Sequence, residues 1–157
     1  MPIEITGTSG PLPKGRIAIV ASKYNPAISE NLLQGALTTL QEGGIRSDAI
    51  VVIRVPGAWE VPGPTAFLAK RPDVLAVIAL AVVIRGETSH DQHLNRAVTT
   101  ALMKIGLELN KPVLLGVLTC NTVEQAIHRS GGNFGNKGAE CAAAALEMIR
   151  IHAQLSL

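Results

Sequence analysis

The 157-residue chain has about the length of one domain, and 47% of its residues are hydrophobic, which excludes a disordered or collagen-like protein. Only 17% are charged, fewer than the roughly 25% of an average soluble protein, so apolar surface remains that self-association would cover. The 14 Lys and Arg residues form no basic stripe, and one Trp, one Tyr and two Phe are few, which argues against nucleic-acid binding.

Short apolar runs alternate with segments of helical periodicity along the chain. Three prolines and three glycines mark residues 1–15 as an N-terminal arm, followed by a single domain over residues 16–157. Strands are predicted at residues 16–21, 49–55, 74–84 and 112–119. Helices are predicted at residues 26–42, in a short stretch that ends near residue 71, and at residues 89–110, 122–130 and 137–152, with a loop at residues 131–136.

A strand–helix unit therefore repeats four times before a closing helix. Residues 74–84 are apolar throughout, as a central parallel strand must be when helices cover both faces of its sheet. Because crossovers between parallel strands are right-handed, this order predicts a three-layer α/β/α, flavodoxin-like sandwich with a four-stranded parallel sheet. Ligands bind such sheets beyond the carboxyl ends of the strands. We therefore expect the site at residues 22–25, 56–60, 85–90 and 120–122.

Aromatic and acidic side chains follow the first two predicted strands. Tyr24 stands at the first strand-to-helix turn, where its ring can stack on a planar ligand or close the end of the core. Trp59 and Glu60 stand at the tip of the turn VPGAWEVP. A carboxylate beside an aromatic ring suits a ligand rich in hydroxyl donors, whereas Glu in a first helical turn also stabilises the helix dipole. The sequence does not decide between the two interpretations of Tyr24, nor between the two interpretations of the turn with Trp59 and Glu60.

The third strand ends in VVIRGETSH, which predicts an anion site. Gly86 permits a tight turn, after which the backbone N–H groups of Glu87 and Thr88 and the Thr88 hydroxyl can bind an anion at a helix start. His90 falls in the first turn of that helix, where a neutral imidazole exchanges protons near pH 7. A lone histidine is usually a surface or core residue, but the adjacent turn favours proton transfer. His90 and His93 have no third ligand, so we expect no metal.

Two cations flank a glycine-rich loop beyond the fourth strand. Arg129 suits bidentate binding of a phosphate and Lys137 supplies a point charge, although each could instead be a solvated residue near a helix end. The sequence contains neither the dinucleotide motif Gly-x-Gly-x-x-Gly nor the P-loop motif. This argues against a Rossmann dehydrogenase and against a P-loop enzyme.

The cysteine content and the apolar runs predict the compartment. Cys120 and Cys141 are too few for a disulfide framework and form no Cys-x-x-Cys pair. The first fifteen residues have no apolar signal-peptide core, and the longest apolar run is eleven residues, too short to span a bilayer. We therefore expect a soluble cytoplasmic protein with reduced thiols.

Five segments together resemble the 6,7-dimethyl-8-ribityllumazine synthase family of riboflavin biosynthesis. They are KYNPAIS, VPGAWEVP, VVIRGETSH, PVLLGVLT with NTVEQAIHRSG, and GNKGAECAAAALEM, in the order and spacing of that family from about residue 10 to residue 152. The chain departs from the family pattern at Ala81, where glycine is usual, at Asp91, where an aromatic is common, and at Leu115, where phenylalanine is frequent.

The resemblance implies condensation of 5-amino-6-(D-ribitylamino)uracil with 3,4-dihydroxy-2-butanone 4-phosphate to 6,7-dimethyl-8-ribityllumazine, a transferase reaction without a cofactor. It assigns proton transfer to His90 and stacking on the pyrimidine to Tyr24. The other implied site residues are Ala58, Trp59 and Glu60 for the ribityl chain, Val82, Val83 and Ile84 for the uracil through backbone groups, Glu87, Thr88, Arg129 and Lys137 for the phosphate, and Leu115 as a cover over the ring.

The resemblance also implies a homopentamer in which neighbouring subunits share each site. Arg129 and Leu115 would come from the subunit next to the one that holds Tyr24 and His90. Many members build pentamers into a sixty-subunit icosahedral shell, which the short loop GGNFGNKG at residues 131–138 favours, and riboflavin synthase is the partner that such a shell could enclose. Two other functions remain open: a non-catalytic flavin- or lumazine-binding module of the same fold, and a structural container.

Overall fold

Strand β3 (Val74–Ile84) is the centre of the sheet, and nine of its eleven residues are buried. It pairs with β1 (Arg16–Ser22) on one side and with β4 (Val113–Cys120) on the other. β2 (Ile50–Val55) pairs with β1, so the strand order is β2-β1-β3-β4 and every pair is parallel. The computed structural model describes residues 1–156, and it confirms the predicted four-stranded parallel sheet.

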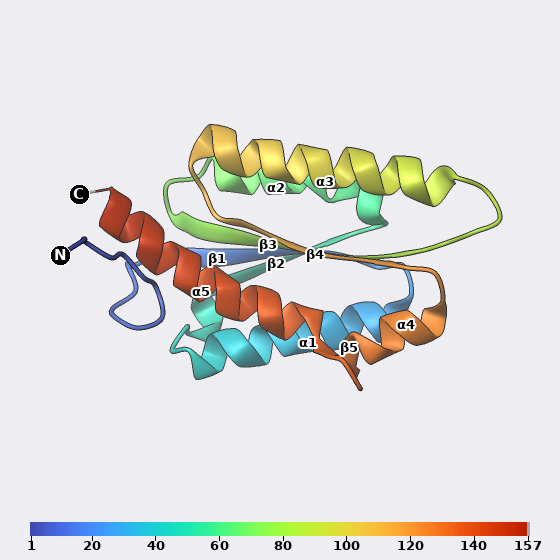
Figure 1. Cartoon of the computed structure of the whole chain (residues 1–157), viewed down its shortest axis with the longest axis horizontal. Coiled ribbons are helices and arrows are strands. Elements are labelled where there is room, and N and C mark those ends of the chain that lie inside the picture. The colour runs from blue at the N-terminus through green and yellow to red at the C-terminus, as the bar shows by residue number, and fades with distance from the viewer. Residues whose placement is uncertain (157) are drawn as a thin grey trace.

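Helices cover both faces of this sheet, as Figure 1 shows. α2 (Pro62–Ala69) and α3 (His90–Leu109) lie on one face. α1 (Pro26–Glu42), α4 (Val123–His128) and α5 (Lys137–Leu155) lie on the other. Two short 3-10 helices, η1 (Ser47–Ala49) and η2 (Ala58–Glu60), flank β2. The predicted three-layer α/β/α arrangement is therefore confirmed.

Alternate residues of each strand point to opposite faces and build two apolar cores. The core toward α1 and α5 includes Ile17, Ile19, Leu32, Leu40, Ile78, Leu80 and Leu146. The core toward α2 and α3 includes Val20, Val61, Val77, Val98 and Leu102. Burying each of these side chains stabilises the fold by roughly 1.5–3 kcal/mol before the cost of ordering the chain. None of the helices in the described part of the chain has the length and apolar character that a membrane crossing requires.

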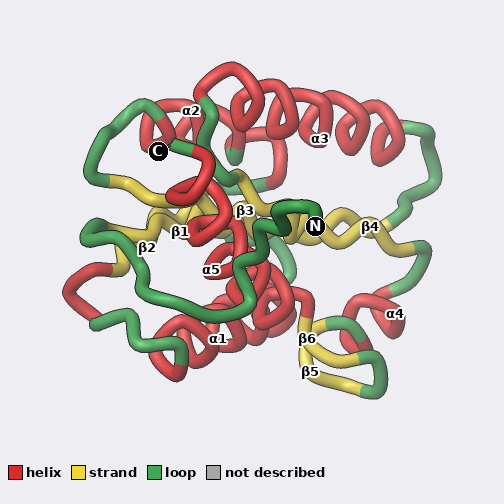
Figure 2. Tube along the Cα trace, turned by 60° about the vertical axis from the view of Figure 1, so that its left-hand side comes forward, coloured by secondary structure: helices red, strands yellow, loops and turns green. Residues whose placement is uncertain are grey.

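The segment predicted as a loop after α4 is instead a small antiparallel hairpin of β5 (Ser130–Gly132) and β6 (Gly135–Asn136). Figure 2 shows it beside α4. Gly131 and Gly135 have φ values of 115° and 79°, which L side chains rarely adopt. The sequence does not predict this hairpin, because its strands have no alternating apolar residues. The closing helix also runs three residues beyond its predicted end, to Leu155.

The start of α5 is fixed against α1 by Asn136 and Gly138. The Asn136 side chain caps α5 by accepting from the Ala139 N–H at 3.1 Å, and it donates to the Asn31 carbonyl in α1 at 2.9 Å. A Cβ on Gly138 would lie 1.9 Å from the Leu32 carbonyl oxygen, so only glycine permits this crossing. Asn136 and Gly138, two residues of the quoted segment GNKGAECAAAALEM, therefore have a structural role.

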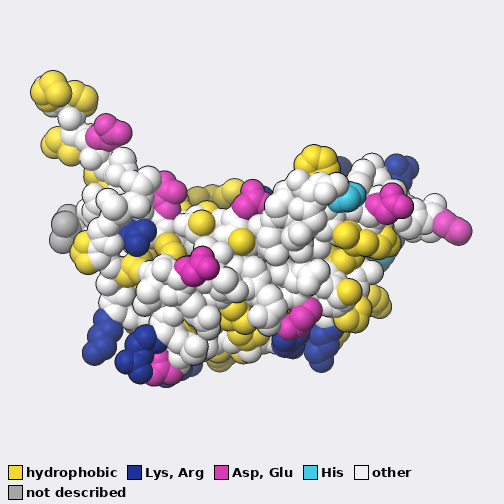
Figure 3. All heavy atoms as spheres, turned by 90° about the horizontal axis from the view of Figure 1, so that it is seen from below, with side chains coloured by type: hydrophobic (Ala, Val, Ile, Leu, Met, Phe, Trp, Pro, Cys, Tyr) yellow, Lys and Arg dark blue, Asp and Glu magenta, His cyan; other side chains and the backbone are white. Residues whose placement is uncertain are grey.

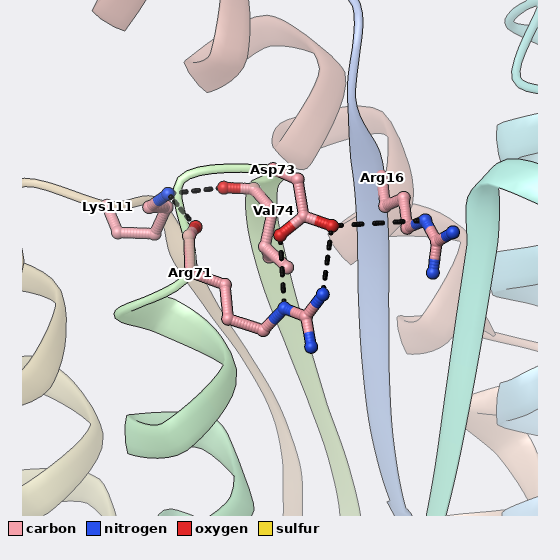
Figure 4. A network of polar contacts seen from close by, with 5 residues as sticks. All are labelled: Arg16, Arg71, Asp73, Val74 and Lys111. Carbon is pink, nitrogen blue, oxygen red and sulfur yellow. Dashed lines mark hydrogen bonds and ion pairs between the residues drawn. The ribbon is translucent and has the colours of Figure 1, made fainter.

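Polar groups tie together the amino ends of the strands, as Figure 4 shows. The Arg71 guanidinium donates to both oxygens of Asp73 at 3.0 and 3.2 Å, and Arg16 pairs with the same carboxylate at 4.0 Å. Lys111 donates to the carbonyl oxygens of Arg71 and Val74. The hydrogen bonds from Arg71 lower the pKa of the Asp73 carboxyl, and burial lowers the pKa of Lys111. This network joins the turn before β3 to the starts of β1 and β4.

The N-terminal arm contains no helix or strand and lies partly against α5. The Arg150 guanidinium in α5 donates to the carbonyl oxygens of Gly10 and Gly7 at 2.9 and 3.2 Å. Beyond this contact the arm projects from the body of the molecule, with hydrophobic side chains at its tip (Figure 3). Met1 and Ile3 are both exposed there. The tip is apolar surface that this chain does not cover by itself.

Gly138→Ala should lower the free energy of unfolding by about 1–3 kcal/mol, because the new methyl group would force α1 away from α5. Gly106→Ala in α3 is the matched control: its Cβ would lie 3.2 Å from the nearest atom, and better helix propensity offsets that contact. Urea unfolding followed by circular dichroism, at one protein concentration, measures both variants. Equal stabilities would contradict the close crossing at Gly138.

Candidate active site

A cleft of about 760 Å³ opens beyond the carboxyl ends of β1, β2 and β3, beside the start of α3. In Figure 1 the carboxyl ends of these strands and the start of α3 lie on the right-hand side. The predicted site residues that line it are Tyr24, Ala58, Trp59, Glu60, Val82, Val83, Ile84, Thr88 and His90. The fold therefore gathers predicted site residues from three separate strand ends into one cavity.

The turn after β1 presents Tyr24 to the cleft. Asn25 adopts a left-handed conformation with φ 53° before α1, and the Ser29 hydroxyl donates to the Tyr24 carbonyl at 2.6 Å. A Cβ on Gly57 would lie 3.1 Å from the Tyr24 ring, so the ring packs closely over that glycine. The side chain remains 69% exposed. Tyr24 therefore does not close the core, and its ring is available to a planar ligand.

The turn after β2 presents Trp59 and Glu60. The Gly57 N–H donates to Oε2 of Glu60 at 3.1 Å, so this carboxylate stabilises the start of η2. The other oxygen, Oε1, accepts no hydrogen bond from the described residues. Trp59 is 64% exposed on the cleft wall. One Glu60 oxygen therefore stabilises the start of the short helix, and the other can accept a further hydrogen bond.

The turn between β3 and α3 has the features of an anion site. Its start is anchored by the Arg85 N–H, which donates to the Cys120 carbonyl at 2.8 Å. Within residues 1–156, the backbone N–H groups of Glu87 and Thr88 donate to no protein acceptor. The Thr88 hydroxyl accepts from the His90 N–H at 3.3 Å, which leaves its own proton free to donate. His90 is the first residue of α3 and lines the cleft at this turn.

Four predicted site residues do not line this cleft. Glu87 belongs to the turn, but its side chain lies outside the lining. Leu115 lies on β4 in a different groove, beside α3. Arg129 follows α4 on the opposite face of the sheet, and Lys137 begins α5, where its N–H donates to the Arg129 carbonyl at 2.8 Å. Within one chain, Leu115, Arg129 and Lys137 therefore lie away from the cavity.

The cleft wall also contains residues to which the sequence assigned no role in binding. Asn25, within the expected segment at residues 22–25, lies beside Tyr24, and Asp91, His93, Leu94 and Ala97 extend the wall along α3 beyond the expected segments. Helical spacing from His90 could have identified the last three, because residues three, four and seven positions apart share one helix face. No cluster of three or more His, Cys, Asp or Glu side chains suited to a metal occurs in the part of the chain that the structure describes.

Comparison with known proteins identifies the family. A family model described as 6,7-dimethyl-8-ribityllumazine synthase matches residues 14–153. The chain belongs to the 6,7-dimethyl-8-ribityllumazine synthase family. The 6,7-dimethyl-8-ribityllumazine synthase of Rhodopirellula baltica is 50% identical to this chain over 152 residues, which is 97% of this chain and 98% of the relative. Those from Aquifex aeolicus and Xanthomonas oryzae pv. oryzae are 43% and 47% identical over 140 and 139 residues.

The alignments with the Aquifex and Xanthomonas proteins also cover most of both chains. The aligned parts amount to 89% of this chain and 91% of the Aquifex protein, and to 88% and 90% for the Xanthomonas protein. The lumazine synthase match begins just before β1 and ends within α5. Every strand end that lines the cleft therefore lies inside the matched region, and the first thirteen residues of the arm lie outside it.

Proposed function

We propose that this chain catalyses the condensation of 5-amino-6-(D-ribitylamino)uracil with 3,4-dihydroxy-2-butanone 4-phosphate to 6,7-dimethyl-8-ribityllumazine, with release of phosphate and water. One observation carries the proposal. In a member of the lumazine synthase family, a single cleft holds exposed aromatic side chains, a carboxylate and a histidine, and the turn beside it carries backbone N–H groups that donate to no acceptor within residues 1–156. These are the groups that a polyhydroxylated pyrimidine and a sugar phosphate require.

The pyrimidine occupies the part of the cleft between β1 and β3. Tyr24 stacks on its ring, and the backbone groups of Val82, Val83 and Ile84 at the end of β3 bind the polar edge of the uracil. The ribityl chain extends toward η2, where Ala58, Trp59 and Glu60 line the wall. Oε1 of Glu60 accepts from a ribityl hydroxyl, because Oε2 is already bonded to Gly57.

The phosphate binds at the turn before α3. The free N–H groups of Glu87 and Thr88, the Thr88 hydroxyl and the positive end of the α3 dipole favour an anion there. Arg129 adds bidentate, charge-assisted hydrogen bonds, and Lys137 supports it with a second positive charge. This arrangement places the butanone carbons beside His90.

Catalysis depends on proximity and proton transfer. The 5-amino group attacks the ketone carbon, and loss of water gives an imine. A proton then leaves the carbon next to the imine, and the phosphate departs from the terminal carbon with its electron pair. The ribitylamino nitrogen closes the second ring, and a second water leaves. His90 accepts and returns these protons, because its imidazole lies at the turn that holds the phosphate.

The charges of the cleft support a site shared between subunits. Its lining in the described chain includes the carboxylates Glu60 and Asp91 but no lysine or arginine, although the substrate is a phosphate. We infer that Arg129 reaches each site from the neighbouring subunit, together with Leu115, which is 46% exposed on β4. A closed ring satisfies this need for every subunit, and we propose a cytoplasmic homopentamer that assembles further into a sixty-subunit shell able to enclose riboflavin synthase.

The direct test is incubation of the purified protein with both substrates while the absorbance and fluorescence of the lumazine product are followed. Steady product formation with release of one phosphate per lumazine supports the proposal. Binding of lumazine or flavin without product formation would instead indicate a non-catalytic binding module. Assembly with neither binding nor turnover would indicate a structural container.

His90→Ala should lower kcat by about 10²- to 10⁴-fold and leave binding of the pyrimidine substrate nearly unchanged, because general acid–base catalysis has that magnitude. His93→Ala is the matched control, since it removes an imidazole one helical turn farther along the same cleft wall. Its effect on kcat should stay below about tenfold. Steady-state kinetics on both variants decide the point, and a His90→Ala rate within about threefold of wild type would remove His90 from the mechanism.

Arg129→Ala should weaken binding of the butanone phosphate by about 1.5–3 kcal/mol, the usual range for a hydrogen bond to a charged group. Binding of the pyrimidine substrate should change much less. Arg46→Ala serves as the control, because Arg46 pairs with the exposed Asp48 before the start of β2 and does not line the cleft. The KM of each substrate is measured with the other saturating. Equal weakening of both substrates by Arg129→Ala would show that the residue acts through structure.

A further inference from the structure

The end of α4 and the β5–β6 hairpin bring three side chains into one stack. The guanidinium carbon of Arg129 lies 5.9 Å from the centre of the Phe134 ring. The His128 ring packs edge-on against the same phenyl ring, with ring centres 5.9 Å apart and an interplanar angle of 86°. Phe134 is nevertheless 71% exposed, so burial in a core does not account for an aromatic residue at this position.

The backbone holds the Phe134 ring at this position. The Phe134 N–H donates to the His128 carbonyl at 2.9 Å, and the Lys137 N–H donates to the Arg129 carbonyl at 2.8 Å. A Cβ on Gly132 would lie 2.8 Å from the His128 Cα, so the hairpin approaches the end of α4 more closely than any other residue would permit. The hairpin is therefore held against the end of α4, and this contact places the Phe134 ring beside Arg129.

Within residues 1–156, the Arg129 guanidinium forms no hydrogen bond and no ion pair. A long, exposed arginine without partners samples many rotamers, and ordering it on binding costs free energy. The Phe134 ring attracts the guanidinium through its face, which restricts these rotamers and uses none of the N–H donors. A carboxylate partner would also order Arg129, but it would occupy the donors and repel a phosphate.

We propose that Phe134 is a positioning residue for Arg129, preorganising its guanidinium to bind the phosphate of the butanone substrate. This inference rests on the proposed function, since it takes the role of Arg129 from there. His128 supports the stack by packing. The edge-on contact of its ring with Phe134 helps to hold the phenyl ring in place. The Nδ1 of His128 is buried and has no hydrogen-bond partner among the described residues.

Phe134→Leu and Phe134→Tyr separate the effect of the aromatic face from that of apolar volume. Phe134→Leu keeps an apolar side chain but removes the ring, and we expect it to raise the KM for the butanone phosphate by about two- to fivefold. We expect Phe134→Tyr to retain the wild-type value, because its ring offers the same face. Neither variant should change the KM for the pyrimidine substrate or the midpoint of thermal unfolding.

A double-mutant cycle with Arg129→Ala tests whether the two residues act together. In the Arg129→Ala background, Phe134→Leu should have no further effect on the KM for the butanone phosphate. Inhibition by inorganic phosphate supplies a second readout, and its inhibition constant should rise in parallel with that KM. An unchanged KM in Phe134→Leu, or an undiminished effect in the Arg129→Ala background, would overturn the inference while wild-type lumazine formation still upheld the proposed function. Failure of the wild-type protein to form lumazine would overturn the proposed function itself.

Discussion

A strand of eleven apolar residues, β3, must be covered on both faces, and the rest of the structure depends on that requirement. β3 pairs in parallel with both β1 and β4, so each connection has to return to the same end of the sheet. A helix lies in each of these connections, and the helices pack on the two faces of the sheet and bury β3. As a consequence, the strand ends and the start of α3 meet at one edge, where the cleft lies.

The same layered arrangement divides the proposed phosphate site between two faces of the sheet. The turn before α3 lies with the layer that contains α2 and α3, whereas Arg129 lies with α4 and α5. Among residues 1–156 of one chain, no arginine lines the cleft beside this turn. The shared site that we propose would resolve this separation, because the α4 layer of a second copy would meet the cleft of its neighbour. The apolar tip of the arm and the exposed Leu115 add surface that such contacts would cover.

Much of the fold and the cleft could be predicted from local sequence features. The continuous apolar run of β3, Pro26 at a helix start and the turn at Gly86 each specify their own segment, and parallel pairing then places their ends together. The hairpin at residues 130–136 could not be predicted in this way. Its geometry comes from glycines at left-handed positions and from two backbone hydrogen bonds to the end of α4, neither of which produces an apolar pattern.

The roles of single site residues depended on geometry that spacing alone does not provide. The exposure of Tyr24 excludes a role in closing the core, and the bond from Gly57 shows which Glu60 oxygen is already used. The contact between Phe134 and Arg129 needs a tertiary arrangement, because the two residues lie on different elements. In contrast, the cleft position of His93 follows directly from its helical spacing to His90.

The claim that each site is shared between subunits is tested most directly by mixing His90→Ala and Arg129→Ala subunits. The two variants are dissociated, combined in equal amounts and reassembled, and lumazine formation is measured at a low concentration of the butanone phosphate. Random mixing gives each neighbouring pair about one chance in four of joining an intact His90 to an intact Arg129, so about a quarter of wild-type activity should return. A mixture of His90→Ala with Thr88→Val, which damages the same half of the site, should stay inactive. Activity no greater than the mean of the separate His90→Ala and Arg129→Ala variants would contradict a shared site.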